Sequence, residues 1–193
     1  MRDKKTLEMT LIGLFSAIII AMAFIPQVGF FRYGGIAITT LHIPVIIGAI
    51  FGGAKFGIAL GFTFGLFSFI VAITLPDPGN LIFQNPILAI APRVIFGLSI
   101  WYVYRGLRRL FKKPEVHLPL TFLLTTLIHT GVTVAFIILF QASIREFFGA
   151  FYNVILIIFP LNGLVEIGLA ILIGTPIVMR LRRSQAFEIL KEE

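Results

Sequence analysis

The sequence predicts an all-α integral membrane protein with six transmembrane helices, on the basis of its composition, its uncharged runs and the placement of its basic residues. Of the 193 residues, 58 % are hydrophobic and only 13 % are charged, and the mean hydropathy is +1.01. A soluble domain carries about a quarter charged residues. This chain therefore lacks the polar residues that would cover a water-facing surface.

The uncharged runs are long enough to cross a bilayer, which takes about 20 apolar residues. Residues 11–31 contain no charged side chain, and residues 118–144 contain none unless His129 is protonated. Hydrophobic periodicity and turn residues divide the chain into six expected spans. They lie at residues 9–26, 36–53, 55–75, 86–104, 118–140 and 152–180.

Glycine and proline mark the expected boundaries between these spans. Pro26 ends the first span, the Gly52-Gly53 pair separates the second from the third, and the P-D-P-G turn at residues 76–79 closes the third. The last span is long, and Pro160 is expected to break or kink it.

The basic residues predict the orientation, because cytoplasmic loops are rich in Lys and Arg. With the amino terminus inside, the outer side holds only Arg32 and Arg145. Both termini are then cytoplasmic, and we attribute the net charge of +7 to membrane topology and not to binding of nucleic acid. The basic residues expected inside are Arg2, Lys4, Lys5, Lys55, Arg105, Arg108, Arg109, Lys112, Lys113, Arg180, Arg182, Arg183 and Lys191.

Small residues recur at helical spacing in the first three spans. Residues four apart share one face of a helix, and small residues on such a face let two membrane helices approach closely. Two interpretations stay open: packing among these three helices, or a docking face for a membrane partner. The stripes are Gly13, Ala17 and Ala21, then Gly48 and Gly52, then Gly57, Gly61 and Gly65.

Polar residues occur at depth in the second half of the chain, at Arg93, His129, Asn162 and Glu166. Polar groups inside a membrane face the bundle interior or a water-filled cavity. These residues belong to three different spans at similar depth, which predicts a shared cavity. Residues expected at its mouth are Gln84, Asn85 and Asn153.

Arg93 has two possible roles. It can form an internal ion pair with Glu166, or it can bind an anionic ligand, most simply a carboxylate, through two parallel hydrogen bonds. The two roles are compatible if the ion pair forms only without ligand. We favour a structural role for His42, although its place with Thr39 and Thr40 near the outer end of the second span also allows ligand contact. Further candidates for ligand contact are the aromatic residues Tyr33, Phe67 and Phe83.

The sequence lacks the motifs of a membrane enzyme. It has no cysteine, no H-E-x-x-H or G-x-S-x-G motif, and only Glu166 as a carboxylate within a span, so we expect no catalytic residue and no metal site. A proton-driven carrier is expected to show more than one buried carboxylate. There is no nucleotide-binding loop, so any ATP-driven work requires another subunit.

The blocks ITTLHIPVIIGAIFGGAKFGIALGFTFGLFSF (residues 38–69) and NPILAIAPRVIFGL (residues 85–98) resemble the substrate-binding S components of energy-coupling factor (ECF) vitamin transporters, especially the pantothenate-type members. The likeness covers nearly the whole chain and implies one domain over residues 1–193. It assigns partner docking to residues 9–75, including the stripes with Gly13 and Gly57, and the substrate cavity to residues 86–180. Loops 27–37 and 76–85 would cap this cavity.

The resemblance also implies the setting of the protein. An S component lies in the prokaryotic cell membrane and joins a transmembrane T component and two cytoplasmic ATPases, which bind the ATP, so no cofactor is expected in this chain. Arg93 would hold the pantothenate carboxylate, and Asn162, His129 and Asn85 its other polar groups. The alternatives are riboflavin or another vitamin as the substrate, or a self-sufficient secondary carrier.

Overall fold

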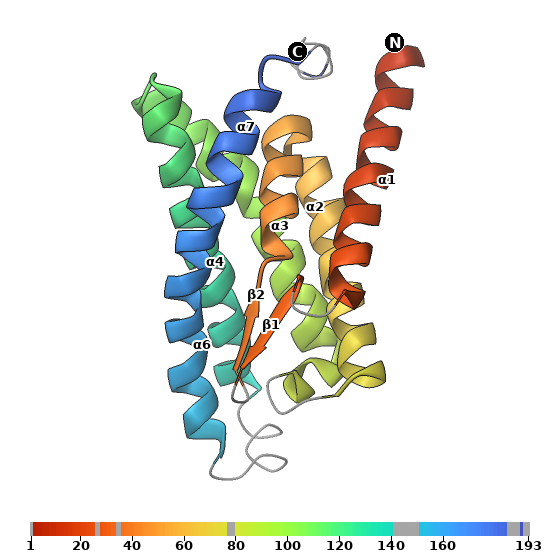
Figure 1. Ribbon diagram of the computed structural model, residues 1–193, viewed down its shortest axis with the longest axis vertical. Coiled ribbons are helices and arrows are strands. Elements are labelled where there is room, and N and C mark those ends of the chain that lie inside the picture. The colour runs from red at the N-terminus through yellow and green to blue at the C-terminus, as the bar shows by residue number, and fades with distance from the viewer. Residues whose placement is uncertain are drawn as a thin grey trace.

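The computed structural model describes residues 2–25, 28–33, 36–76, 80–140, 151–184 and 190. Long helices run side by side along the longest axis of the molecule, and both termini lie at the same end (Figure 1). The helices are α1 (Arg2–Phe24), α2 (His42–Thr74), α3 (Pro86–Leu110), α4 (Pro114–Leu139), α6 (Phe151–Leu169) and α7 (Thr175–Leu181). The other elements are the strands β1 (Phe30–Tyr33) and β2 (Ile36–Thr39), the 3-10 helix η1 (Leu81–Gln84) and the π-helical turn η2 (Ala170–Gly174).

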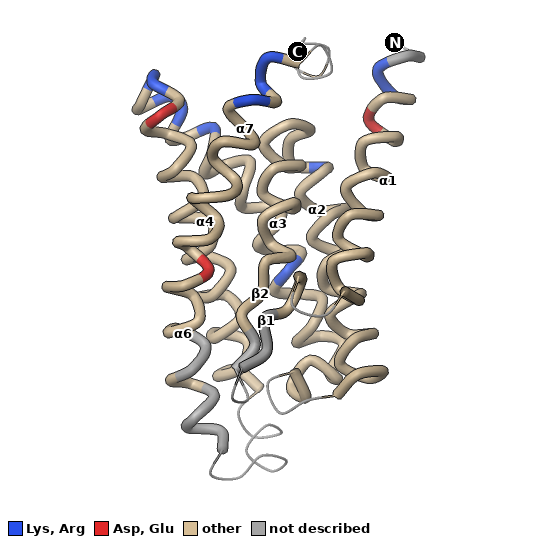
Figure 2. Tube along the Cα trace, in the orientation of Figure 1, with Lys and Arg blue, Asp and Glu red and all other residues tan. Residues whose placement is uncertain are grey.

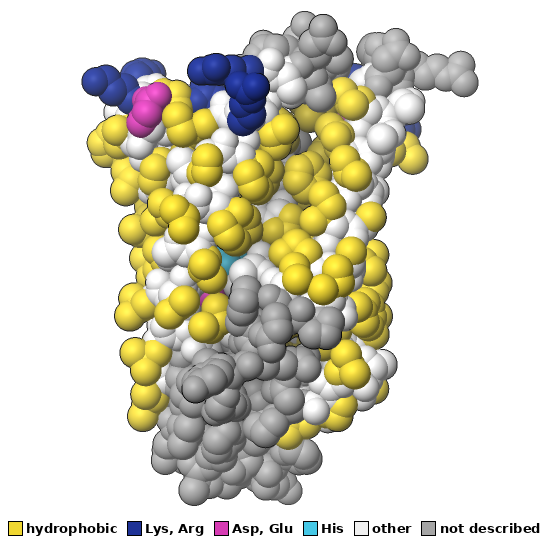
Figure 3. All heavy atoms as spheres, viewed as in Figure 1, with side chains coloured by type: hydrophobic (Ala, Val, Ile, Leu, Met, Phe, Trp, Pro, Cys, Tyr) yellow, Lys and Arg dark blue, Asp and Glu magenta, His cyan; other side chains and the backbone are white. Residues whose placement is uncertain are grey.

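Five helical stretches among the described residues are long and apolar enough to cross a membrane. They are Lys4–Phe24, His42–Thr74, Pro86–Leu110, Pro114–Leu139 and Pro160–Leu181. Hydrophobic side chains cover much of the flank of the bundle (Figure 3), and Lys and Arg residues gather at the end that carries both termini (Figures 2 and 3). An apolar flank with a basic end is the pattern expected of a membrane protein.

Helix α2 consists of two segments that fold back on each other at Gly53. Gly53 has φ 77° and ψ −163°, a conformation that glycine adopts far more readily than other residues. A Cβ atom added at Gly57 would lie 3.3 Å from Cβ of Ala49, whereas residues eight apart in a straight helix are separated by about 12 Å. Residues 42–52 and 54–74 therefore lie against each other, with the turn where the Gly52-Gly53 pair predicts one.

The predicted helix at residues 36–53 is wrong in its first six residues. Residues 36–39 form β2, which pairs antiparallel with β1 in the register Phe30↔Thr39 to Tyr33↔Ile36, and the helix begins only at His42. Ile36, Ile38 and Thr39 are β-branched, a type enriched in strands. Hydropathy alone does not distinguish such a short apolar strand from the start of a helix.

Pro160 does not break the last predicted span. Helix α6 continues through Pro160 to Leu169, and the irregular turn lies ten residues later, at η2. Proline is tolerated inside membrane helices where local adjustments satisfy the carbonyl group that it frees. The predicted break at Pro160 is therefore wrong, and the irregular turn follows at η2.

The glycine stripe of the second α2 segment packs against α3 inside the molecule. Added Cβ atoms would lie 2.0 Å from the Gly97 carbonyl oxygen at Gly57, 2.3 Å from the Arg93 oxygen at Gly61, and 2.7 Å from Cα of Ile90 at Gly65. Gly57 and Gly61 thus present no surface to a partner, because α3 covers them. The stripe of α1 differs: Gly13, Ala17 and Ala21 are exposed, and nothing lies within 4 Å of a Cβ added at Gly13.

Two clusters of buried apolar side chains form the core. The larger joins α1, α2, α3, α4 and α7, and the smaller joins the end of α2 with η1, α3 and α4. Val71 from the larger cluster and Phe83 from the smaller one both line a polar cavity. This cavity therefore lies where the two clusters meet.

Candidate functional site

The polar cavity draws its walls from both halves of the chain. Its volume is about 40 Å³, enough for one to a few water molecules and far below the several hundred Å³ of a typical ligand pocket. The lining residues are Phe30 of β1, Thr39 of β2, Ser68 and Val71 of α2, Asn80 and Phe83 around η1, Arg93 of α3, His129, Thr130 and Thr133 of α4, and Asn162 and Glu166 of α6.

Arg93 is buried in this cavity with few of its donors used. Its side chain is 4 % exposed, and Nη1 donates to the carbonyl oxygen of Leu88 at 2.9 Å. Among the described residues, Nε has no hydrogen-bond partner. The guanidinium carbon lies 4.0 Å from the ring centroid of Phe83 and 5.5 Å from that of Phe64. These aromatic faces stabilise the cation but accept no conventional hydrogen bonds.

Glu166 is engaged by the β hairpin. Its Oε1 accepts a hydrogen bond of 2.8 Å from the backbone N–H of Thr39. Within the part of the chain that the structure describes, no Lys or Arg nitrogen lies within 4.0 Å of its carboxylate oxygens. The direct Arg93–Glu166 ion pair that the sequence left open is therefore not formed, although both side chains line the cavity.

His129 forms an aromatic part of the wall. Its ring centroid lies 4.9 Å from that of Phe96 and 5.5 Å from that of Phe64. His42 stacks behind it, with centroids 5.7 Å apart and ring planes at 19°. In the part of the chain that the structure describes, neither ring nitrogen of His42 has a hydrogen-bond partner, and neither does Nδ1 of His129. His129 faces the cavity, and His42 supports it from outside.

Asn162 reaches the cavity because α6 approaches α4 closely at the next residue. A Cβ atom added at Gly163 would lie 2.7 Å from Oγ1 of Thr130, so no larger residue fits there without displacing Thr130. Asn162 itself is 8 % exposed. The hydroxyl of Thr133, also in the wall, already donates to the carbonyl oxygen of His129 at 2.9 Å.

The structure thus brings together six residues predicted from the sequence, which are Arg93, His129, Asn162, Glu166, Phe83 and Thr39. Several other predicted residues lie elsewhere. Asn85 caps α3 by accepting from the backbone N–H of Ile87 and Leu88, which is the ordinary role of Asn before a helix. The side chains of Tyr33 and Asn153 lie outside the described residues.

Phe67, Thr40 and Gln84 are also outside the cavity wall. Phe67 packs edge-on against Phe24, with centroids 6.0 Å apart. The hydroxyl of Thr40 donates to the carbonyl oxygen of Val28, and Gln84 donates to that of Ala72 at 2.9 Å. These polar groups satisfy the backbone near the hairpin and η1, so their hydrogen bonds are structural.

Sequence reasoning missed Phe30, Ser68, Val71, Asn80, Thr130 and Thr133 in the wall. A usable signal existed for Thr133, because it lies four residues after His129 and therefore on the same helical face. Phe30 and Asn80 are different, because they come from the two connections whose path no periodicity predicts. Loops 27–37 and 76–85 do both contribute to the wall, through Phe30 and through Asn80 and Phe83.

The described residues contain no group of three or more His, Asp or Glu side chains placed to hold a metal ion. The cavity instead combines one guanidinium, one carboxylate, one imidazole, two carboxamides, several hydroxyl groups and two aromatic rings of phenylalanine. A set of this kind can bind a small polar molecule that carries a negative charge.

Comparison with known proteins supports a transport role. Residues 7–178 match the family described as ECF transporter, substrate-specific component. The chain therefore belongs to this family of membrane transport proteins, which are not enzymes, and the resemblance stated from the sequence is confirmed.

Two relatives carry more specific names. A pantothenate transporter PanT from Leuconostoc mesenteroides subsp. mesenteroides is 34 % identical over 105 residues, 52 % of each chain. A pantothenic acid transporter PanT from Lactococcus lactis subsp. cremoris is 25 % identical over 201 aligned positions, which cover 96 % of this chain and 98 % of the relative. The match to the first relative thus spans about half its length.

Proposed function

We propose that this protein is the membrane-embedded substrate-binding component of an ECF-type importer and that its substrate is pantothenate. ATP hydrolysis in two partner ATPases, coupled through a transmembrane T component, would drive the import. Family membership supports the binding role, and the names of both relatives support the vitamin.

An anionic substrate is favoured chiefly because the buried guanidinium of Arg93 has no carboxylate in direct contact among the described residues. A buried arginine stays charged and requires compensation, yet its side chain has one hydrogen bond, to Leu88, and no carboxylate within ion-pair distance among the described residues. A carboxylate ligand would supply the missing charge and accept two hydrogen bonds. Riboflavin is neutral and would leave Arg93 without an anionic ligand.

The remaining polar groups suit the rest of pantothenate, which has one amide and two hydroxyl groups. Asn162 offers both donors and acceptors, and His129 has Nδ1 without a partner. The volume of about 40 Å³ is too small for the vitamin. Binding therefore requires the hairpin β1–β2 or the loop at η1 to move outward, since these are the short connections in the wall.

The proposed topology has six spans with both termini cytoplasmic. Taking β2 with residues 42–52 of α2 as one crossing, and residues 54–74 as the next, raises the five long apolar stretches to six. The basic residues at the end of the bundle that carries the termini (Figure 2) then lie in the cytoplasm. We assign partner docking to the exposed face of α1 with Gly13, Ala17 and Ala21, because small residues favour close helix contacts.

The test of the substrate is calorimetry on the purified protein with pantothenate and with its alcohol analogue, in which CH₂OH replaces the carboxylate. Removing one partner of a buried charge pair costs about 2–5 kcal/mol, so Arg93→Ala is expected to weaken pantothenate binding by roughly 30-fold or more. The same variant should change binding of the alcohol analogue far less.

The matched control is Arg109→Ala, because Arg109 is exposed at the basic end of α3 and does not line the polar cavity. If Arg93→Ala weakens binding of pantothenate and of its alcohol analogue equally, Arg93 does not recognise the carboxylate.

Reconstitution of the chain alone in liposomes tests the importer assignment. Substrate accumulation without the T component and ATPases would identify a self-sufficient carrier.

A further inference from the structure

A second cavity lies at the end of the bundle that carries both termini, and it shares no lining residue with the polar cavity. Its volume is about 590 Å³, within the range of ligand sites. The geometry points to a binding site for one anionic phospholipid, with the phosphate headgroup in this cleft and an acyl chain in the apolar groove beside it. This inference goes beyond the proposed transport function and does not depend on it.

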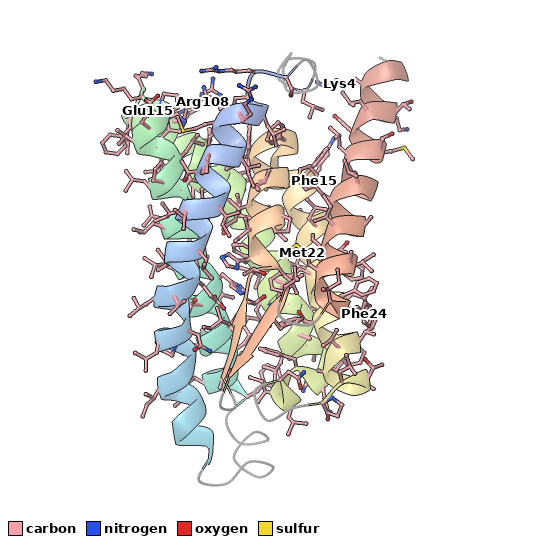
Figure 4. All side chains as sticks on the ribbon, viewed as in Figure 1. Lys4, Phe15, Met22, Phe24, Arg108 and Glu115 are labelled. Atoms are coloured by element: carbon pink, nitrogen blue, oxygen red, sulfur yellow. The ribbon has the colours of Figure 1, made fainter. Side chains whose placement is uncertain are left out.

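The charge of the cleft favours a phosphate. Lys4 of α1, Lys55 of α2, and Arg105 and Arg108 of α3 line it, against the single carboxylate of Glu8 among the described residues. Lys4 and Arg108 lie at the same end of the bundle on different helices (Figure 4). Arginine binds phosphate through its planar fork, and basic pockets between membrane helices on the cytoplasmic side are typical sites of anionic headgroups.

The floor of the cleft is aromatic and closely packed. The α2 turn at Gly53 lies against Trp101, with 3.8 Å between an added Gly53 Cβ and the indole ring. Trp101 in turn lies 6.0 Å, centroid to centroid, from Tyr104. Trp and Tyr concentrate at the depth of the headgroups in membrane proteins, so this floor is at the level where a lipid phosphate would lie.

An apolar groove of about 630 Å³ adjoins the basic cleft, and Phe51 lines both. The groove runs between α1, the first segment of α2, and α7. From Leu11 to Met22, α1 covers about 16 Å at 1.5 Å per residue. That length is close to the ~15 Å depth of hydrocarbon in one leaflet.

Along one face of α1 the side chains change from charged to apolar, in the same order in which a phospholipid changes from headgroup to acyl chain. Lys4 and Glu8 border the basic cleft, and Leu11, Phe15, Ile18 and Met22 line the groove. Steps of three and four residues keep all six on one side of the helix. Figure 4 shows Lys4, Phe15 and Met22 following one another along α1. The exposed stripe of Gly13, Ala17 and Ala21 lies on a different face, so a lipid here leaves the proposed docking surface uncovered.

The test compares lipids retained by the purified protein, measured by native mass spectrometry after incubation with phosphatidylglycerol or phosphatidylcholine. We expect preferential retention of phosphatidylglycerol. The double variant Lys55→Gln/Arg105→Gln should weaken the retention of phosphatidylglycerol by tenfold or more. Arg109→Gln/Lys113→Gln removes the same charge from exposed residues that line neither space and should change it less than twofold. Thermal unfolding checks that both variants are folded.

Three outcomes would overturn the proposal. Equal retention of the two lipids would exclude headgroup recognition. If both double variants lose retention of phosphatidylglycerol equally, lipid binding depends only on the overall surface charge. Inorganic phosphate or glycerol phosphate that competes as strongly as phosphatidylglycerol would show a phosphate site without a role for the groove.

Discussion

The backbone N–H of Thr39, at the end of β2, donates a hydrogen bond to Glu166 in α6, with 2.8 Å between nitrogen and oxygen. Both residues are buried, at 8 % and 5 % exposure, and 127 residues of chain separate them. This bond ties the β hairpin to α6 at the wall of the polar cavity. Among the described residues no carboxylate oxygen lies within 4.0 Å of a nitrogen of Arg93, which leaves the guanidinium available to a ligand.

Replacing Glu166 should loosen the hairpin only if the acceptor is lost. Glu166→Gln keeps a carbonyl oxygen for the Thr39 N–H, whereas Glu166→Leu leaves this buried donor unpaired at a cost of about 1–3 kcal/mol. Hydrogen exchange of the Thr39 amide should therefore be roughly 10-fold to 100-fold faster in the Leu variant and close to wild type in the Gln variant. Equally slow exchange in both variants would contradict the anchoring role.

The two stacked histidines should differ in their effect on ligand binding. His129 lines the cavity and His42 lies behind it. A hydrogen bond contributes about 0.5–1.5 kcal/mol, so His129→Phe should weaken pantothenate binding by roughly 2-fold to 10-fold.

His42→Phe keeps the ring stack and is the matched control. Calorimetry on both variants is expected to show a loss for His129→Phe alone. A larger loss for His42→Phe would mean that the ligand contacts the deeper ring.

A larger side chain should have different effects on stability and ligand binding at Gly61 of α2 and at Gly13 of α1. At Gly61 a Cβ atom would lie 2.3 Å from the carbonyl oxygen of Arg93, whereas at Gly13 nothing lies within 4 Å. Overpacking costs about 1–3 kcal/mol, so Gly61→Val should lower the unfolding temperature of the purified protein and also weaken binding by displacing Arg93.

Gly13→Val should leave both properties of the isolated chain unchanged. In cells that supply the partner subunits, Gly13→Val is expected to reduce pantothenate uptake, because valine would hold the α1 face away from another helix. Normal uptake by a correctly expressed Gly13→Val variant would argue against docking through this face.

The six-span topology can be tested with single cysteines, because the chain contains none. Lys55 follows the Gly53 turn, and Leu75 comes directly after the second segment of α2; both are exposed. Lys55→Cys should react with a membrane-impermeant thiol reagent only from the cytoplasmic side, and Leu75→Cys only from the outside. Labelling of both from one side would exclude a crossing between them.

Much of the helical framework could be predicted because hydropathy is a local property of the chain. Uncharged runs of about 20 residues have few alternatives to a membrane helix, and the Gly52-Gly53 pair marked a real reversal at Gly53. The errors arose where hydropathy does not discriminate. An apolar strand at residues 36–39 looked like the start of a helix, and α6 continued through Pro160.

The sequence by itself determined that this is a membrane protein with buried polar residues at Arg93, His129, Asn162 and Glu166, because apolar runs and the charges within them are readable without a fold. Only the tertiary structure decided which of these meet and what else joins them. In the structure the backbone N–H of Thr39 donates to Glu166, and Asn85 caps α3. Helix α3 packs over Gly57 and Gly61. The physical reason is that helix rotation and loop path depend on contacts between residues far apart in the chain, which no local pattern records.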